Sequence, residues 1–155
     1  MKVIPIDAFF DDVEKALSEG KSVELRCTGS SMQPYLRGDG SETIVASPFS
    51  PDELIRGTVV LFRYKGRYIC HRIIQRKEGK LLIQGDGTIA KQEQIPVSDV
   101  LGIIHTVVRR NKKPVSTHTK TAQWYWRCWL RLTPMRKFFL LPYRLWLKVA
   151  HFLKI

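Results

Sequence analysis

The chain has 155 residues, 44% of them hydrophobic, and it carries a formal net charge of +12 and three cysteines. This length favours one domain with a sizeable core and room for an appendage. Cys27, Cys70 and Cys128 are too widely spaced for a disulfide framework or a zinc site, and they favour a reducing compartment. The opening residues include an early acid and no long apolar run, so no signal peptide is predicted.

The positive charge lies entirely in the last third of the chain. Residues 1–100 contain 14 Lys and Arg and 14 Asp and Glu, whereas residues 101–155 contain 12 Lys and Arg and no acid. A basic segment that is separated in this way raises the question of what that segment contacts.

A helix is predicted from Asp7 to Gly20, since Asp7 can cap its start and Gly20 can end it. Four apolar residues fall at helical spacing on one face of it: Phe9, Val13, Ala16 and Leu17. The pattern indicates a helix that packs on the rest of the domain.

Short strands follow the helix. The predicted strands cover residues 22–27, 43–46, 58–64, 67–75, 80–84 and 100–108. Lys65-Gly66 predicts a hairpin turn, and Gly85-Asp86-Gly87 ends the fifth strand with a second turn. We therefore expect residues 1–110 to form a mainly β domain that begins with one helix.

The rest of the chain is predicted to be a linker and a tail. Residues 111–121 are polar and basic, which is typical of a linker of low order. Residues 122–155 hold all four tryptophans, and Pro134 and Pro142 should divide them into short helical pieces. No piece reaches the roughly 20 apolar residues that a spanning helix needs.

Two interpretations of this basic amphipathic helical tail stay open. It can lie in the interface of an anionic membrane, through its basic residues, tryptophans and leucines. It can instead be a helical cap that packs on the β domain while its charges stay solvated. Nucleic acid is not expected as a partner, because the aromatic residues are accompanied by leucines, which suit lipid better than bases.

The residues that carry chemistry are centred on Ser31, which lies in Gly29-Ser30-Ser31-Met32, where the first strand ends. A serine needs a base within hydrogen-bond reach, and the candidate is His71, which lies within a strand and can accept a proton at physiological pH when its imidazole is neutral. Asp86 can present a carboxylate that fixes the histidine tautomer. The structural alternatives are a packed strand histidine and an aspartate that only forms a turn. The remaining histidines are poorer candidates: His105, His118 and His151.

Five segments in order resemble the conserved boxes of type I signal peptidases and LexA-like peptidases. They are Gly29-Ser30-Ser31-Met32-Gln33-Pro34 with Gly38-Asp39, Arg56-Gly57-Thr58-Val59-Val60-Leu61-Phe62, Cys70-His71-Arg72-Ile73-Ile74, Leu82-Ile83-Gln84-Gly85-Asp86, and residues 95–104. The resemblance covers about residues 22–108. It implies the mainly β fold of that family and a serine endopeptidase that acts on a precursor protein or leader peptide without a metal or cofactor.

The resemblance also implies a role for each matching position. Ser31, directly before Met32, would be the nucleophile, and His71 would be the general base in a Ser-His dyad. Asp86 would be an orienting or structural acid. The backbone N–H of Ser31, with help from Ser30, would form the oxyanion hole. Gly29 departs from the serine that many signal peptidases have at its position.

The chain looks most like short bacterial signal-peptidase-like proteins without an N-terminal anchor, and the tail can replace that anchor. We therefore expect peripheral association with the cytoplasmic face of a membrane. Two other functions stay open: a non-catalytic peptide-binding or membrane-surface module, and a self-cleaving LexA-like regulator. The regulator would need a DNA-binding domain, and only residues 1–21 precede the first strand.

Overall fold

A computed structural model describes residues 6–152, without the side chains of residues 6–9 and 151. The strands are β1 Val23–Thr28, β2 Asp39–Ser47, β3 Val59–Tyr64, β4 Arg67–Lys77, β5 Lys80–Gln84, β6 Glu93–Pro96, β7 Val100–Val108 and β8 Pro114–Ser116. The helices are α1 Ile6–Ser18, α2 Lys120–Arg131 and α3 Arg136–Phe152. The contributions expected from the side chains of Asp7 and Phe9 lie outside the described residues.

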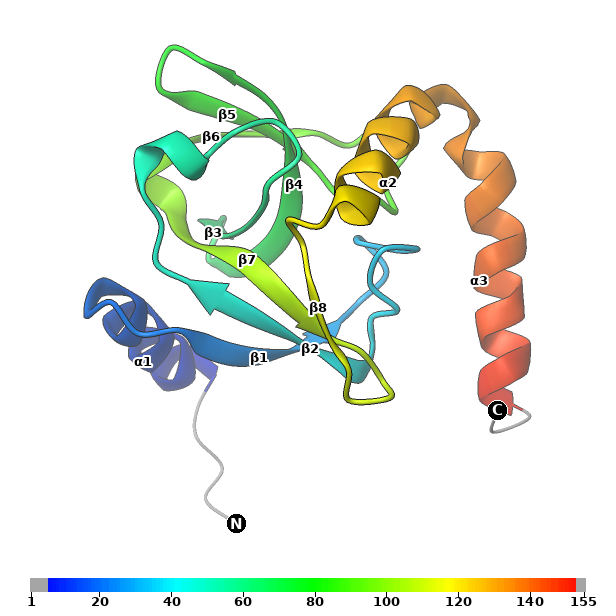
Figure 1. The fold of residues 1–155 in the computed structure, drawn as a ribbon, viewed down its shortest axis with the longest axis horizontal. Coiled ribbons are helices and arrows are strands. Elements are labelled where there is room, and N and C mark those ends of the chain that lie inside the picture. Colours follow the sequence, from blue (N-terminus) through cyan, green and yellow to red (C-terminus); the bar gives the residue numbers. More distant parts are fainter. Residues whose placement is uncertain (1–5, 153–155) are drawn as a thin grey trace.

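The strands form one antiparallel sheet in the order β1-β2-β7-β3-β4-β5-β6, and β8 pairs with β7. The register shifts where β7 pairs with β2 and with β3, and again where β4 pairs with β5. Such bulges bend a sheet, and here the sheet coils around itself (Figure 1). The mainly β fold with an N-terminal helix is confirmed.

The coiled sheet encloses two apolar clusters. The first packs Val13 and Leu17 of α1 against β1, β2 and β7. The second lies among β3, β4, β5 and β6 and includes Phe62 and Ile73. Alternate residues of β3 enter the two clusters, because successive side chains of a strand point to opposite faces. Strands β3 and β4 therefore form the wall between the clusters, and His71 lies in that wall.

The predicted strand positions are confirmed, with most ends within two residues of the prediction; β2 begins four residues earlier than predicted, and two strands were not predicted. Strand β6 is short, ends at Pro96 and begins with a polar residue, so its sequence does not alternate clearly. Strand β8 lies within residues 111–121, which had been interpreted as a linker of low order. That interpretation is wrong at this point, because β8 pairs with β7 between Thr106↔Ser116 and Val108↔Pro114.

The tail forms two helices. Pro134 lies in the 3₁₀ turn that separates α2 from α3, as expected of a helix-breaking residue. Pro142, however, lies inside α3, so the prediction that it divides the tail is wrong. Pro142 and Phe138 are both exposed, so water can reach the carbonyl that loses its helical partner. No helix within residues 6–152 combines the length and the apolar composition that crossing a bilayer requires.

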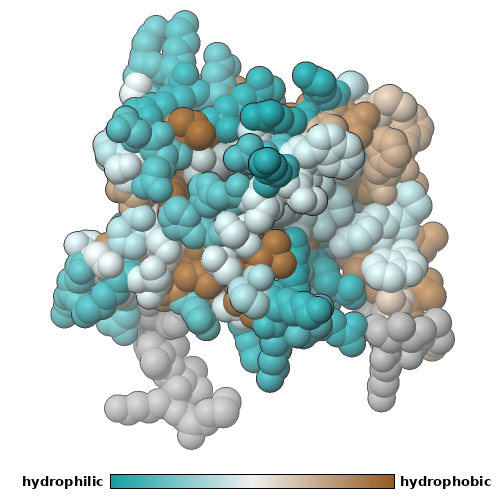
Figure 2. Space-filling model, viewed as in Figure 1, coloured by the Kyte–Doolittle hydropathy of each residue, from teal (hydrophilic) through white to brown (hydrophobic). Residues whose placement is uncertain are grey.

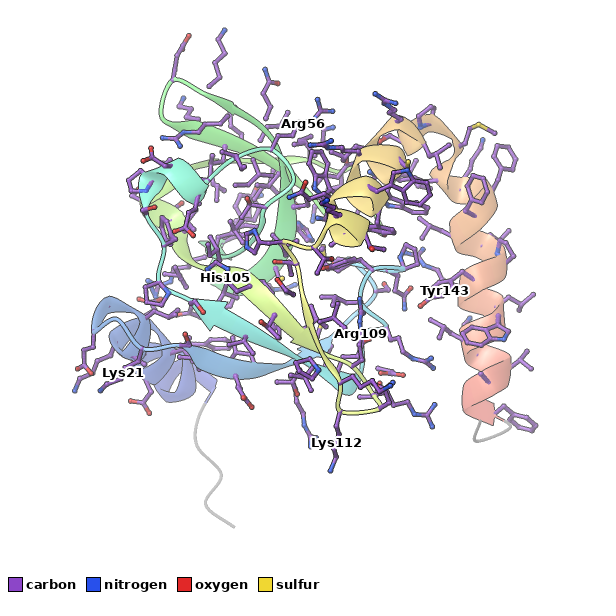
Figure 3. All side chains as sticks on the ribbon, in the orientation of Figure 1. Lys21, Arg56, His105, Arg109, Lys112 and Tyr143 are labelled. Carbon is purple, nitrogen blue, oxygen red and sulfur yellow. The ribbon has the colours of Figure 1, made fainter. Side chains whose placement is uncertain are left out.

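Helix α3 lies along one edge of the molecule, and side chains on its outer side stand clear of the β domain (Figure 3). Its other side carries Arg136, Leu140 and Arg144, which are four residues apart and so share one face. Arg136 and Leu140 are 0% and 2% exposed, so α3 is docked on the domain through this face. The tail is in part the packed helical cap that the sequence left open.

Neighbouring leucines of α3 provide a test of this docking. Leu140→Ala should lower the free energy of unfolding by about 2–4 kcal/mol, because it leaves a cavity at a buried site. Leu141 is 74% exposed, so Leu141→Ala should change that free energy by less than about 0.5 kcal/mol.

Urea unfolding measures both effects. All four tryptophans lie in the tail, so their fluorescence follows the tail, while the NMR signals of β7 amides follow the sheet. The two signals should share one midpoint, which Leu140→Ala shifts. A tryptophan transition at lower urea than the β7 transition would contradict the docking.

Candidate active site

Ser31 lies in a tight loop that follows β1. Gly29 has a φ of +95° and its N–H donates to the carbonyl of Gly38 over 2.8 Å. Gly38 has a φ of +71°, and a Cβ there would overlap the carbonyl oxygen of Gly29, so only glycine fits. Ser31 is half-buried in this loop. Its backbone N–H donates to no partner among the hydrogen bonds within residues 6–152.

His71 is held in the wall between the apolar clusters and is 3% exposed. Its Nδ1 lies 3.1 Å from Oε2 of Glu93, and its ring lies against Phe62. Its Nε2 is buried and has no hydrogen-bond partner. A neutral His71 that donates its Nδ1–H to the Glu93 carboxylate presents a free lone pair at Nε2.

The turn Gly85–Thr88, called the 85–88 turn below, lies between the serine loop and the histidine. The N–H of Gly87 donates to the carbonyl of Ser31 over 2.7 Å. A Cβ on Gly85 would overlap the Ser31 carbonyl oxygen and lie 2.9 Å from Nε2 of His71. Gly85 therefore brings backbone close to both groups, and the turn sets the spacing between them.

Ser31 and His71 line one pocket, with a volume of about 500 Å³. Its wall is mostly apolar, and three cations lie at it: Arg26, Arg67 and Lys91. Among the described residues, 6–152, strand β1 pairs only with β2, and β4 pairs with β5 only from Arg72 onward. The backbone of β1 and residues 67–71 of β4 thus have one unpaired edge each, and both border the pocket. Such edges can pair with an extended peptide.

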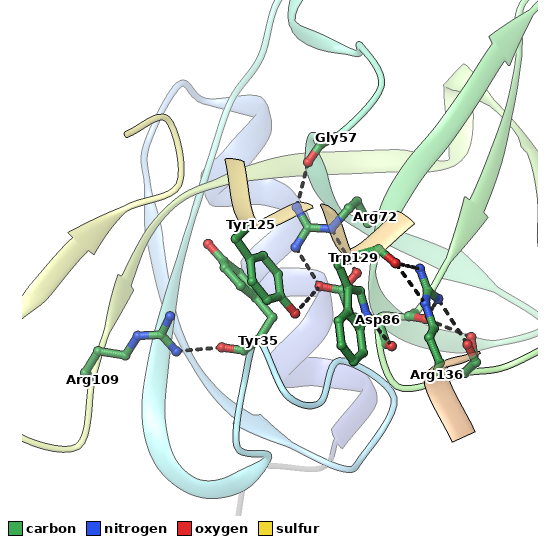
Figure 4. Close-up of polar contacts among 10 residues, drawn as sticks. Tyr35, Gly57, Arg72, Asp86, Arg109, Tyr125, Trp129 and Arg136 are labelled. Carbon is green, nitrogen blue, oxygen red and sulfur yellow. Dashed lines mark hydrogen bonds and ion pairs between the residues drawn. The ribbon is translucent and has the colours of Figure 1, made fainter. Parts of the chain in front are cut away.

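Asp86 does not orient His71. Both of its carboxylate oxygens accept from Arg72, over 2.9 Å from Nε and 2.7 Å from Nη2 (Figure 4). The acid that contacts His71 is Glu93, which comes from β6. Of the two roles predicted for Asp86, orienting or structural acid, these contacts fit the structural one, because Arg72, the residue after His71 in β4, binds both carboxylate oxygens. Glu93 was not predicted because β6 was not predicted: an acid two residues before Ile95 gives no clear alternation in the sequence, and only the structure shows that both residues are buried.

Burial determines the protonation states of the titratable side chains that line the pocket. Burial lowers the pKa of His71 below its usual range, while the neighbouring Glu93 carboxylate acts in the opposite direction. His71 is therefore neutral at physiological pH, as a base must be. Burial raises the pKa of Cys27 to about 11 and that of Cys70 further, so these pocket thiols stay protonated and are poor nucleophiles. Ser31 is left as the nucleophile candidate.

The other histidines lie elsewhere. Nδ1 of His105 lies 2.9 Å from Nε2 of His118, and Nε2 of His105 lies 3.7 Å from Glu53. The side chain of His151 lies outside the described residues. Within residues 6–152 no group of three or more metal-ligating side chains is placed to hold a metal ion.

The tail holds the 85–88 turn in place from outside. Nε1 of Trp129 donates to the carbonyl of Asp86 over 2.9 Å, and Nη1 of Arg136 donates to the carbonyls of Gly85 and Thr88 (Figure 4). Arg144 donates to the carbonyl of Gly87 over 2.8 Å. All four carbonyls of the turn are therefore bound by tail side chains.

Arg144 also connects the turn to the serine loop. Its Nε donates to Oε1 of Gln33 over 3.2 Å, and its Nη2 lies 3.5 Å from the carbonyl of Ser30. Ser30 itself is exposed. The geometry of the serine loop thus depends on contacts from a helix more than a hundred residues away in the chain.

A comparison with models of protein families gives no match for this chain, and a comparison with curated proteins gives none.

The Arg72–Asp86 pair yields a stability prediction. Asp86→Asn should lower the free energy of unfolding by about 3–5 kcal/mol, because it leaves the buried Arg72 guanidinium without a counter-charge. Urea denaturation measures the loss. Asp12→Asn, at an exposed position of α1, is the matched control and should change stability by less than about 0.5 kcal/mol.

The double variant Arg72→Met/Asp86→Asn should be more stable than Asp86→Asn alone, since no unpaired charge remains in it. An equally small effect of Asp86→Asn and Asp12→Asn would show that the ion pair contributes nothing.

Proposed function

We propose that this chain is a serine endopeptidase with the fold of the signal-peptidase and LexA-like peptidases, in which Ser31 is the nucleophile and His71 the general base. The observation that carries the proposal is the buried, unpartnered Nε2 of His71 in the pocket that Ser31 also lines. A nitrogen lone pair that is buried without a partner is costly, and a functional base explains its retention.

The proposed reaction is acyl transfer to Ser31. Nε2 of His71 takes the hydroxyl proton as Oγ of Ser31 attacks the scissile carbonyl, and the carbonyl oxygen becomes an oxyanion. The free backbone N–H of Ser31 stabilises that oxyanion, with Ser30 as the second contributor. The Glu93 carboxylate stabilises the imidazolium.

The histidine then returns the proton to the leaving amine, and an acyl-enzyme remains. In the deacylation step, Nε2 of His71 removes a proton from water as the water attacks the acyl carbonyl, and His71 then returns that proton to Oγ of Ser31 as the serine leaves. No cofactor takes part.

The proposed substrate is an extended segment of a precursor protein or leader peptide. The free edges of β1 and of residues 67–71 border the pocket on two sides, so a peptide strand between them can pair with backbone. The apolar wall suits apolar side chains near the cut, and the cations Arg26, Arg67 and Lys91 suit an acidic flank.

A second candidate is a module that binds such a peptide without cutting it. It is favoured by one observation: Nε2 of His71 makes no hydrogen bond, to Ser31 or to any other described residue. Catalytic hydrogen bonds are often long in the unbound state and shorten when substrate binds, so the same observation is compatible with an enzyme. Reactivity of Ser31 separates the two functions.

A fluorophosphonate probe tests the nucleophile without a known substrate. The native chain should gain one probe mass at Ser31 by intact mass spectrometry, and Ser31→Ala should gain none. His71→Ala should slow labelling at neutral pH by on the order of 10³-fold, since the general base is lost. Ser98→Ala, at an exposed position of the chain, should label at the native rate. A native chain that binds peptide but resists the probe would establish the non-catalytic module.

Glu93→Gln tests the orienting acid through its pH dependence. The native labelling rate should fall only as pH drops below the usual histidine pKa of about 6.5, because burial lowers the pKa of His71. Glu93→Gln should slow labelling by on the order of 10³-fold through loss of the correct tautomer. It should also shift the fall of the labelling rate at low pH, called the acid limb of the pH–rate profile, to lower pH, because the carboxylate that favours the imidazolium is gone.

Glu42→Gln is the matched control, because Glu42 is equally buried but is paired with Arg109. It should lower stability and leave the acid limb where it is in the native chain. An acid limb that Glu93→Gln leaves unmoved would remove Glu93 from the site.

A further inference from the structure

Helix α3 has an apolar face that points away from the molecule. Five residues that recur every three or four positions are 49–86% exposed: Phe138, Leu141, Leu145, Val149 and Phe152. This set is called the outer stripe. Residues at this spacing share one side of a helix, and the docking face of Arg136, Leu140 and Arg144 lies on the other side. Figure 2 shows apolar side chains at the edge of the molecule where α3 lies.

The two borders of the outer stripe differ in chemistry. Lys137 and Lys148 each come one position before a stripe residue and so lie along one border. Phe139 and Trp146 each come one position after a stripe residue and lie along the other, 47% and 54% exposed. Cations beside an apolar face with an aromatic border are typical of helices that lie flat in a membrane interface.

Charge distinguishes the possible occupants of this face. Residues 101–155 contain 12 Lys and Arg and no acid. A second copy of the chain would bring one basic, acid-free tail against another, and like charges oppose that contact. A surface of anionic lipid headgroups complements the lysines and takes up the apolar stripe at the same time.

We propose that the outer stripe of α3 docks on an anionic membrane surface, with α3 in the plane of the interface and Lys137 and Lys148 against the lipid phosphates. A 17-residue helix measures about 25 Å, so the stripe engages lipid along its length. This inference does not depend on the proposed peptidase activity.

Sedimentation of the full chain with vesicles tests the proposal. The native chain should bind vesicles of phosphatidylcholine with phosphatidylglycerol better than vesicles of phosphatidylcholine alone, and salt should weaken the binding. Leu141→Glu/Leu145→Glu should weaken binding to the anionic vesicles at least about tenfold, because charge replaces the centre of the stripe. The uncharged pair Leu141→Ser/Leu145→Ser should act in the same direction. Both positions are exposed, so unfolding midpoints should stay unchanged.

Ile55→Glu is the matched control, since Ile55 is 60% exposed and lies outside the tail; it should bind as the native chain does. Lys137→Glu/Lys148→Glu should weaken binding and flatten its salt dependence. The proposal fails if the native chain does not bind anionic vesicles, or if the α3 variants and Ile55→Glu bind equally. It also fails if light scattering shows twice the 18.0 kDa mass and only the α3 variants are monomeric.

Discussion

The buried ion pair between Arg72 and Asp86 is the constraint on which the arrangement of the candidate site depends. Removing two charges from water is expensive, and only good geometry with further hydrogen bonds offsets the cost. Here the pair is bidentate, Nη1 of Arg72 also donates to the carbonyl of Gly57, and the guanidinium lies over the rings of Tyr35 and Tyr125. Because Asp86 is fixed in this way, the 85–88 turn has one position between the serine loop and the histidine.

The tail completes the same structure rather than being an appendage to it. Trp129, Arg136 and Arg144 bind the carbonyls of the 85–88 turn, and within residues 6–152 those of Asp86 and Gly87 accept from no other group. Unpaired buried carbonyls are costly, so the turn and the tail stabilise each other. The proposed catalytic groups and the proposed membrane face therefore belong to one packed unit. A membrane bound to the outer side of α3 would fix how the pocket is oriented above it.

Much of the fold could be predicted from the sequence, but the partners within the site could not. Alternation of apolar residues locates most strands, and the strand position of His71 follows from it. Asp86 was given the wrong partner because a glycine-flanked turn shows that a carboxylate is presented, not to which side chain. Glu93 was missed because β6 is short and polar, and the strand forms by pairing with β5 residues that are ten to sixteen positions away in the chain. Contacts across strands are set by register, which the hydrophobic pattern of a short, polar strand specifies only weakly.

The tail shows why composition alone leaves the function of a basic segment open. Which side of the helix a cation lies on decides whether it is buried. Arg136 is 0% exposed and bound to the 85–88 turn, whereas Lys137, the next residue, is exposed. A count of charges in the sequence treats Arg136 and Lys137 as equivalent. The apolar residues divide in the same way, since Leu140 is buried and Leu141 is open to solvent. Because the inner face is already bound by the domain, packing within the fold does not account for the apolar outer face, and the proposed membrane contact would cover it.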